Sequence, residues 1–369
     1  MKLRYATIDN FKGLKHLEID FSSRTGLRPI TALLGDNGSG KTTCLQALAL
    51  TLSMATRRTR EPQSFAWHGF LPERVPNLGP TRVELAVELH PEEIAITSTL
   101  FKEWEASLPS DRRQTMKLVP PASNPVVTLV YENGQVTSPL GFEAVTQFLG
   151  RYYVKALAAI RPAVRDNFRL LGDIFWFDQH RNLGTRIFSG TYTGRGVPIE
   201  EPPREGWQAG VEQLREYLVG WWGFHTTPAA KRNGKDYIPA LQQHMDHVFP
   251  GTRFIGLGQR DSMTEARAND FYFLIDRDGR IYDLAEMSSG EQAVFPVAYD
   301  FVRLDISRSI VLIDELELHL HPPEQQRLLA ALPLIGPDCQ FIITTHSDFL
   351  SAAIPNEHEV RLSGGTRCL

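Results

Sequence analysis

The sequence predicts an α/β protein with a mainly parallel β-sheet and a glycine-rich loop between one of its strands and a helix. An apolar run at Pro29–Leu34 precedes a glycine-rich loop and a Leu/Ala-rich helical stretch at Lys41–Ala55. Near the other end of the chain, two short apolar runs, Ile310–Ile313 and Phe341–Ile343, flank a helical stretch at Pro322–Leu332. Strands that alternate with helices in this way are typical of parallel sheets with helical crossovers.

The composition is that of an ordinary soluble globular protein. The chain has 369 residues, of which 42% are hydrophobic and 22% are charged, so we expect two domains or one domain with a large insertion. The net charge of −4 excludes a uniformly basic nucleic-acid binder, but a local basic face stays open. We expect a cytoplasmic protein, because Cys44, Cys339 and Cys368 are far apart and no apolar run approaches the roughly 18 residues of a membrane span.

The middle of the chain differs from its two ends. Residues 61–250 are rich in Pro, Gly and Trp and show no sustained period, whereas the ends are regular. We therefore predict an N-terminal lobe at residues 1–60, an α/β or mainly helical insertion at 61–250, and a C-terminal lobe at 251–369. Within the last lobe, Phe271–Asp283 predicts a hairpin that turns at an Asp-Gly pair.

The glycine-rich loop carries the most specific motif. Gly35–Thr42 fits GxxxxGK[ST], and it lies between a predicted strand and a predicted helix, the context that confirms a P-loop. Backbone N–H groups in such a turn form a concave anion site, and the helix N-terminus adds partial positive charge. Lys41 is expected to reach the β- and γ-phosphates of ATP and to act in catalysis, and Thr42 to bind Mg²⁺. The expected nucleotide contacts are Asn37, Gly38, Ser39, Gly40, Lys41, Thr42 and Thr43.

Two acids follow the apolar run at Ile310–Ile313, as in a Walker B element. Asp314 would hold Mg²⁺ directly or through water, and Glu315 would polarise the water that attacks the γ-phosphate. Acids often follow buried strands at protein surfaces, so the pattern alone is weak. The P-loop upstream makes the Walker B interpretation strong.

Two further motifs could contact phosphate. Ser288 and Gly290 begin a predicted helix and would form a second anion site, although a plain helix cap with Glu291 in the first turn is the alternative. His346 follows the Phe341–Ile343 run and could hydrogen-bond a γ-phosphate, although a structural histidine is the alternative. The order of all four motifs favours the functional interpretation.

This ordered set resembles the ABC-type ATPases of the SMC/RecF/OLD superfamily, and within it the short AAA-like ATPases of bacterial defence and DNA-repair operons. The resemblance covers about residues 1–56 and 284–363. Ile8–Leu14 resembles the family's I-x-N-F-K/R start, which implies that Lys12 lies near phosphate. The resemblance implies an ABC-type P-loop head with a mixed sheet, interrupted by the insertion.

The resemblance also assigns roles. Ser288–Glu291 would be the signature motif, which in the family reaches the γ-phosphate held by the opposite subunit. Two copies would then pair head to tail around two ATP molecules. Leu318–Pro322 resembles the D-loop, and His346 would be the switch histidine.

The remaining family position is the glutamine of the Q-loop, a metal ligand. Gln179 is the first candidate and Gln63 the second, and a surface glutamine is an equally good interpretation of each. The sequence departs from the family at Leu316, where proline is usual, and at Met287, where leucine or phenylalanine is common. Neither departure removes a charged catalytic group.

These features predict an ATP-hydrolysing switch, slow or regulated, in a bacterial anti-phage module. The segment after His346 has no room for a TOPRIM nuclease, so we expect a separate nuclease or toxin as the effector. The alternative is a RecF-like DNA clamp, for which the basic cluster Arg57, Arg58 and Arg60 offers one DNA contact. The long interruption between P-loop and signature disfavours a transporter subunit, and we expect no membrane partner.

Overall fold

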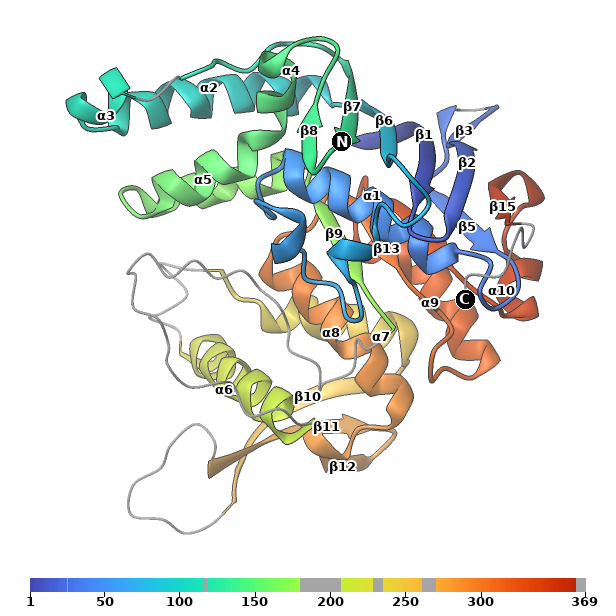
Figure 1. The fold of residues 1–369 in the computed structure, drawn as a ribbon. Helices are drawn as coiled ribbons and strands as arrows, with labels where there is room; N and C mark the ends of the chain where they lie inside the picture. Colours follow the sequence, from blue (N-terminus) through green and yellow to red (C-terminus); the bar gives the residue numbers. More distant parts are fainter. Residues whose placement is uncertain (25, 116–117, 180–206, 228–234, 261–269, 363–369) are drawn as a thin grey trace. The chain divides into compact units, whose positions relative to one another are not determined.

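The computed structural model describes residues 1–24, 26–115, 118–179, 207–227, 235–260 and 270–362, which form two compact units (Figure 1). Unit 1 comprises Met1–Gln179, Ile306–Leu316 and Gly336–Leu369, and unit 2 comprises His180–Asp305 and Glu317–Ile335. Cys368 lies outside the described residues. The three-part division of the sequence at residues 60 and 250 stays a prediction.

Unit 1 contains two five-stranded sheets, one parallel and one antiparallel. The parallel sheet has the order β15-β5-β14-β13-β9, and its strands are β5 (Ile30–Leu34), β9 (Ile174–Phe177), β13 (Ile310–Ile313), β14 (Gln340–Thr344) and β15 (Glu359–Arg361). The antiparallel sheet has the order β2-β1-β6-β7-β8, and its strands are β1 (Lys2–Phe11), β2 (Leu14–Asp20), β6 (Arg82–Glu88), β7 (Val126–Glu132) and β8 (Gln135–Thr137). A small pair, β3 (Ser22–Ser23) and β4 (Gly26–Leu27), completes the strands described in this unit. The predicted α/β class is confirmed.

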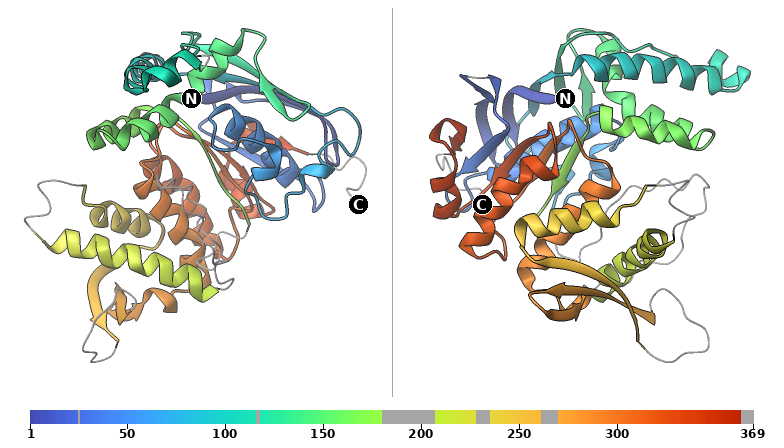
Figure 2. Two further views of the ribbon diagram at one scale, coloured as in Figure 1. Left: turned by 60° about the vertical axis from the view of Figure 1, so that its left-hand side comes forward. Right: turned by 180° about the vertical axis from the view of Figure 1, so that it is seen from behind.

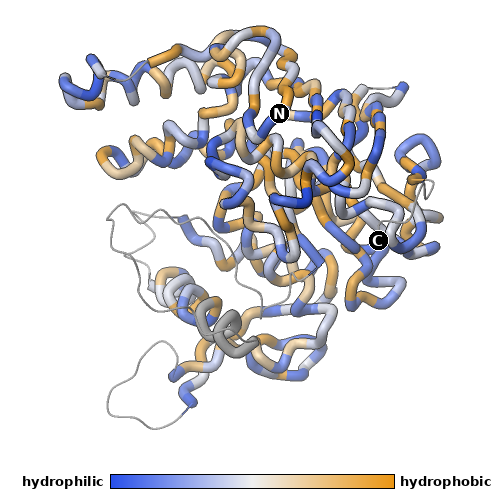
Figure 3. The backbone as a smooth tube through the Cα atoms, viewed as in Figure 1, coloured by the Kyte–Doolittle hydropathy of each residue, from blue (hydrophilic) through white to orange (hydrophobic). Residues whose placement is uncertain are grey.

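Helix α1 (Lys41–Ala55) lies between the two sheets and contacts strands of both. Its residues are buried almost all round, which explains why its sequence is Leu/Ala-rich without a polar face. Figure 3 shows hydrophobic residues concentrated in the interior of unit 1, where α1 meets the strands. This packing fixes the helix N-terminus, and with it the P-loop, at the edge of the parallel sheet.

A buried glutamine joins the parallel sheet to the antiparallel one. Gln340 begins β14 and is 0% exposed. Its Oε1 accepts a hydrogen bond from the Leu3 backbone N–H at 2.6 Å, and its Nε2 donates to the Leu3 carbonyl at 3.0 Å. Both backbone groups of β1 at this point are therefore satisfied by one side chain.

Some of the helices of unit 1 form a second core beside the sheets. Helices α2 (Pro91–Ser107) and α5 (Gly150–Ala158) lie side by side (Figures 1 and 2) and bury an aromatic group around Trp104 and Tyr153. The shorter helices are α3 (Ser110–Thr115), α4 (Phe142–Thr146) and α10 (Asp348–Ala353).

Unit 2 combines a three-stranded antiparallel sheet with four helices among its described residues. The strands are β10 (Thr252–Gln259), β11 (Phe271–Arg277) and β12 (Arg280–Asp283), and the helices are α6 (Trp207–Thr226), α7 (Ile238–Val248), α8 (Ser289–Arg303) and α9 (Pro322–Ile335). The predicted hairpin is confirmed: β11 and β12 pair around Asp278 and Gly279, which both have positive φ, as a two-residue hairpin turn requires.

A buried ion pair anchors this hairpin. Arg215 of α6 donates to Asp283 at 2.5 Å, and both side chains are almost fully buried. Asp283 also accepts from the backbone N–H of Phe273 at 2.8 Å and caps the short turn Leu284–Glu286 that leads to α8. The start of α8 is therefore held in place by the end of the hairpin.

Within the described part of the chain, no helix is both long enough and apolar enough to cross a membrane.

We predict that Gln340→Met lowers the free energy of unfolding by about 2–4 kcal/mol, because both backbone groups of Leu3 lose their buried partner. Urea titration followed by circular dichroism measures this difference. The exposed Gln135→Met of β8 is the matched control, and equal stability of the two variants would contradict the role given to Gln340.

Candidate functional site

The P-loop has the backbone conformation that its glycines allow. Gly35, Gly38 and Gly40 have φ values of 152°, 81° and 96°. A Cβ atom at Gly35 would lie 2.7 Å from the carbonyl oxygen of Leu362, so a side chain does not fit there. The predicted strand–loop–helix arrangement is confirmed, since the loop joins β5 to the first residue of α1.

Lys41 holds its ammonium group over this loop. The side chain is buried, and its Nζ donates to the carbonyl oxygens of Gly35 at 2.8 Å and Asp36 at 3.1 Å. Asn37 and Gly38 are exposed at the tip of the loop. Ser39, Thr42 and Thr43 are partly exposed, whereas Gly40 is buried.

The structure brings Thr42 and Asp314 together across 272 residues of sequence. The hydroxyl of Thr42 donates toward both carboxylate oxygens of Asp314, at 3.1 Å and 2.9 Å. Asp314 directly follows β13 and is 0% exposed. A hydroxyl and a carboxylate at one point are the hard oxygen ligands that Mg²⁺ prefers, so this pair fits the expected metal.

Thr344, for which the sequence pattern predicts no role, completes this arrangement. Its hydroxyl donates to Asp314 Oδ1 at 2.6 Å and accepts from the backbone N–H of Glu315 at 2.7 Å. The signal that could have found it is its place at the end of β14, the parallel neighbour of β13. Parallel strands bring their carboxyl ends to one edge of the sheet, where ligands bind.

The departure from proline at Leu316 has a structural reason. The backbone N–H of Leu316 donates to the carbonyl oxygen of Thr344 at 3.0 Å, a hydrogen bond that proline cannot make. Glu315, just before it, is partly exposed and has a positive φ of 49°, so the chain turns sharply after Asp314.

Gln179 and His346 lie at this same sheet edge. Gln179 follows β9, whose Phe177 pairs with Ile313 of β13, and Asp314 N–H donates to the Phe177 carbonyl at 2.9 Å. His346 follows β14 and is exposed, as is Gln179. Gln63 lies in a short turn at Pro62–Ser64 and does not directly follow a strand of the parallel sheet, whereas Gln179 comes two residues after β9. The roles of both residues stay predictions.

Lys12 lies against the P-loop helix. It occupies the β1–β2 turn with a positive φ of 54°, and its Nζ donates to Gln46 of α1 at 2.8 Å. Leu14, the first residue of β2 after this turn, would lie 3.2 Å from a Cβ at Gly40. The segment around Lys12 therefore contacts both the end of the P-loop and the helix that follows it.

The residues that resemble a signature motif, Ser288–Glu291, lie in unit 2 at the N-terminus of α8. Ser288 is the N-cap, and its Oγ accepts from the backbone N–H of Glu291 at 3.3 Å, while Glu291 accepts from Ser288 N–H at 2.8 Å. The alternative of a helix cap with Glu291 in the first turn is therefore confirmed, and contact with phosphate stays a prediction. Gly290 packs closely on the segment that resembles a D-loop, because a Cβ there would lie 3.1 Å from the carbonyl oxygen of His319.

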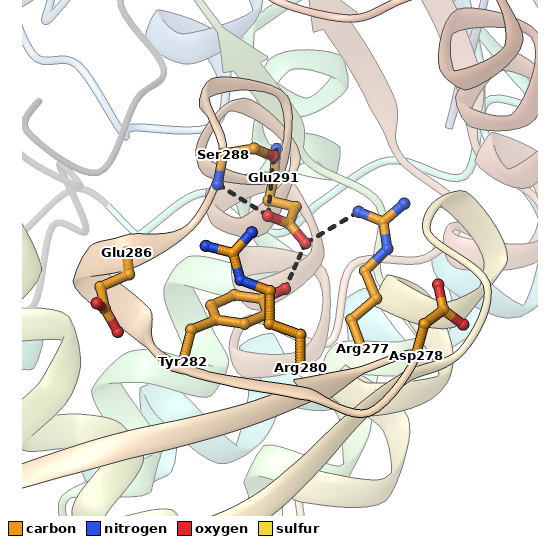
Figure 4. A pocket seen from close by; sticks show the side chains of 7 residues that line it. All are labelled: Arg277, Asp278, Arg280, Tyr282, Glu286, Ser288 and Glu291. Carbon is orange, nitrogen blue, oxygen red and sulfur yellow. Dashed lines mark hydrogen bonds and ion pairs between the residues drawn. The ribbon is translucent and has the colours of Figure 1, made fainter.

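Ser288 and Glu291 open onto a pocket of about 480 Å³ (Figure 4). The other residues that line it are Arg277, Asp278, Arg280, Tyr282 and Glu286. Burial by itself raises the pKa of Glu291, but hydrogen bonds from Tyr282, Ser288 and Arg277 outweigh it and hold that pKa below its usual value. Glu291 is therefore ionised at neutral pH.

Two arginines of the basic cluster after α1, Arg57 and Arg58, make contacts within unit 1. Arg58 donates to the carbonyl of Ile174, forms an ion pair with Asp173 at 3.7 Å and stacks over Phe175. Arg57 lies over the Tyr152 ring, 5.5 Å from its centroid. Contact between this cluster and DNA stays a prediction.

Two family models match the chain. Residues 1–100 match the AAA ATPase domain, and residues 224–352 match an AAA domain family whose description also names the AbiEii toxin and type IV TA systems. The first match contains the P-loop, and the second contains the signature and the acid pair. Both matched segments are therefore similar to ATPase domains of the AAA type, which supports ATP hydrolysis by this chain.

Curated relatives agree with this class. The retron Ec83 probable ATPase of Escherichia coli is 30% identical over 106 residues, which cover 26% of this chain and 19% of the relative. The retron Vc95 probable ATPase of Vibrio cholerae is 28% identical over 108 residues, covering 26% of this chain and 21% of the relative. The Septu protein PtuA of Bacillus mycoides is 24% identical over 98% of this chain and 40% of its own length.

The expected resemblance to ATPases of defence systems is confirmed by these relatives. The chain spans less than half of the length of each of them.

Solved SMC heads align over most of the chain at low similarity. An SMC head bound to the C-winged helix domain of ScpA gives a TM-score of 0.48 at 15% identity, covering 95% of this chain and 91% of that chain. The SMC head domain from Thermotoga maritima gives 0.40 at 16% identity, covering 96% and 92%. At these values the likeness adds nothing to the fold described above.

We predict that Thr344→Val raises the Mg²⁺ concentration for half-maximal ATP hydrolysis about 10–100-fold, because Asp314 loses the hydrogen bond that orients it. Hydrolysis rates measured across a Mg²⁺ titration test this. Thr31→Val in β5 is the matched control, since this buried hydroxyl has no hydrogen-bond partner within the described residues. Identical titration curves for both variants would contradict the assignment.

Proposed function

We propose that this chain is an ATP-hydrolysing switch of an anti-phage defence system, which closes head to tail with a second copy around two ATP molecules. The observation that carries the proposal is the convergence of Lys41, Thr42 and Asp314 at one sheet edge, together with a separate signature serine in unit 2. The retron and Septu relatives support the defence setting.

In this proposal, the P-loop binds the triphosphate. Backbone N–H groups of the glycine-rich turn and the N-terminus of α1 attract the phosphates, and Lys41 exchanges its carbonyl partners for β- and γ-phosphate oxygens. Lys12, beside the loop, adds a further positive charge. Thr42, Asp314 and Gln179 would hold Mg²⁺, which neutralises charge on the transferred phosphoryl group.

Glu315 activates the attacking water. Its carboxylate accepts a proton while the water oxygen bonds to the γ-phosphorus and the bond to the β-phosphate oxygen breaks, which yields ADP and phosphate. His346, at the end of the neighbouring strand, donates a hydrogen bond to the γ-phosphate. The hydrogen bond from the Glu315 backbone N–H to the Thr344 hydroxyl holds this base beside the residues proposed to bind the metal.

Ser288 and Gly290 of one copy contact the γ-phosphate held by the other. Loss of that phosphate removes these contacts, so the ATP and ADP states differ in the stability of the closed dimer. The dimer then controls a separate nuclease or toxin. Salt-dependent DNA binding by the chain would instead favour a RecF-like clamp.

We predict that Lys41→Ala weakens ATP binding about a hundredfold or more, because charged hydrogen bonds to the phosphates are lost. Isothermal titration calorimetry with Mg²⁺-ATP measures the affinity. Lys15→Ala, at an exposed position of β2, serves as the control. Full affinity of the Lys41 variant would refute the P-loop assignment.

We further predict that Glu315→Gln lowers the hydrolysis rate about a hundredfold or more while ATP still binds, since only the general base is lost. ATP-bound dimers then accumulate, as seen by size-exclusion chromatography with light scattering. Glu357→Gln, in an exposed turn, is expected to behave as wild type. A molecular mass that does not respond to nucleotide would rule out the dimer.

A further inference from the structure

The carboxylate of Glu291 is saturated with hydrogen bonds. Ser288 donates to Oε2 through its backbone N–H and through its hydroxyl, both at 2.8 Å. Tyr282 donates to Oε1 at 2.6 Å, and Arg277 donates to the same oxygen at 3.1 Å (Figure 4). A carboxylate offers about four lone-pair sites, so these donors fill it.

In this arrangement, the Ser288 hydroxyl cannot donate a hydrogen bond to a phosphate without giving up its hydrogen bond to Glu291. A hydroxyl has one hydrogen, and that hydrogen points to Glu291 in this structure. To bind a γ-phosphate, the hydroxyl must turn away and leave Glu291 with one donor fewer. A buried carboxylate without compensation resists such a loss, because an ionised acceptor needs its partners.

Tyr282 and Arg277 supply that compensation. Glu291 keeps three of its donors when the Ser288 hydroxyl turns, and one of them carries a full positive charge. Both residues come from the β11–β12 hairpin, which the buried Arg215–Asp283 pair fixes. The Arg277 guanidinium also lies 5.1 Å from the centroid of the Phe249 ring, which holds it in place.

We propose that Tyr282 and Arg277 are positioning residues for the signature serine: by holding Glu291, they free the Ser288 hydroxyl to bind the γ-phosphate of a nucleoside triphosphate carried by a second copy of this chain. This inference rests on the proposed head-to-tail dimer. Neither residue needs to touch the nucleotide. Their effect falls on dimer closure and leaves the binding of ATP by a single copy unchanged.

The test introduces Tyr282→Phe into the Glu315→Gln chain, which keeps the ring and removes one hydrogen bond. Tyr272→Phe is the matched control, because Tyr272 is an exposed residue of the same hairpin whose hydroxyl makes no hydrogen bond within the described residues. ATP affinity is measured at protein concentrations where the chain is monomeric. The dimer dissociation constant is measured by sedimentation equilibrium with Mg²⁺-ATP.

We expect Tyr282→Phe to raise the dimer dissociation constant about tenfold or more, since both sites of the dimer lose a hydrogen bond to a charged group. ATP affinity of the monomer should change less than twofold, as in the control. If Tyr282→Phe does not fold by circular dichroism, Arg277→Gln, at a partly exposed position, decides the question with the same expected result.

An unchanged dimer constant in a folded variant would overturn the role given to Tyr282 and Arg277 and leave the dimer itself intact. An equal loss of monomer ATP affinity would overturn it as well, because the effect would then not be specific to the signature. A parent Glu315→Gln chain that stays monomeric with ATP would refute the proposed function instead.

Discussion

The hydrogen bonds around the Asp314 carboxylate hold the candidate ATP site together. Thr42 and Thr344 both donate to it, so the helix after the P-loop and two neighbouring strands meet at one buried charge. A buried carboxylate is costly unless hydrogen bonds or a cation satisfy it. The same pair of oxygens is suited to Mg²⁺, so the feature that stabilises the sheet edge also prepares it for Mg²⁺-ATP.

The packing of α1 makes this arrangement rigid. Because the helix is enclosed by both sheets, its first turn cannot move without disturbing a large apolar core. Gln179 and His346, by contrast, are exposed at the edge of the parallel sheet. An enclosed P-loop helix with exposed polar groups beside it is consistent with the switch proposed above.

Unit 2 also contains a buried carboxylate, that of Glu291, which is held by several hydrogen bonds. Its signature serine is a helix cap, and capping alone would explain its bonds to Glu291. What capping does not explain is why Tyr282 and Arg277 converge on the same buried carboxylate. With these extra donors, Glu291 keeps three hydrogen bonds when the serine hydroxyl turns to a second partner, as proposed above.

The fold class, the P-loop and the acids after β13 could be predicted from the sequence, because each depends on local patterns: apolar runs, glycine spacing and the residues that end a strand. The sequence also indicated Ser288 and His346, but only through the order of motifs. The role of Thr344 could not be predicted from the sequence, because it depends on the pairing of β13 with β14 and on the Asp314 carboxylate 30 residues away. Tertiary structure alone likewise decided that Gln340 bridges two sheets, that Arg58 is engaged with Asp173, and that the hairpin residues hold Glu291. These are contacts between groups distant in sequence, and no local pattern encodes which distant partner a buried polar side chain will find.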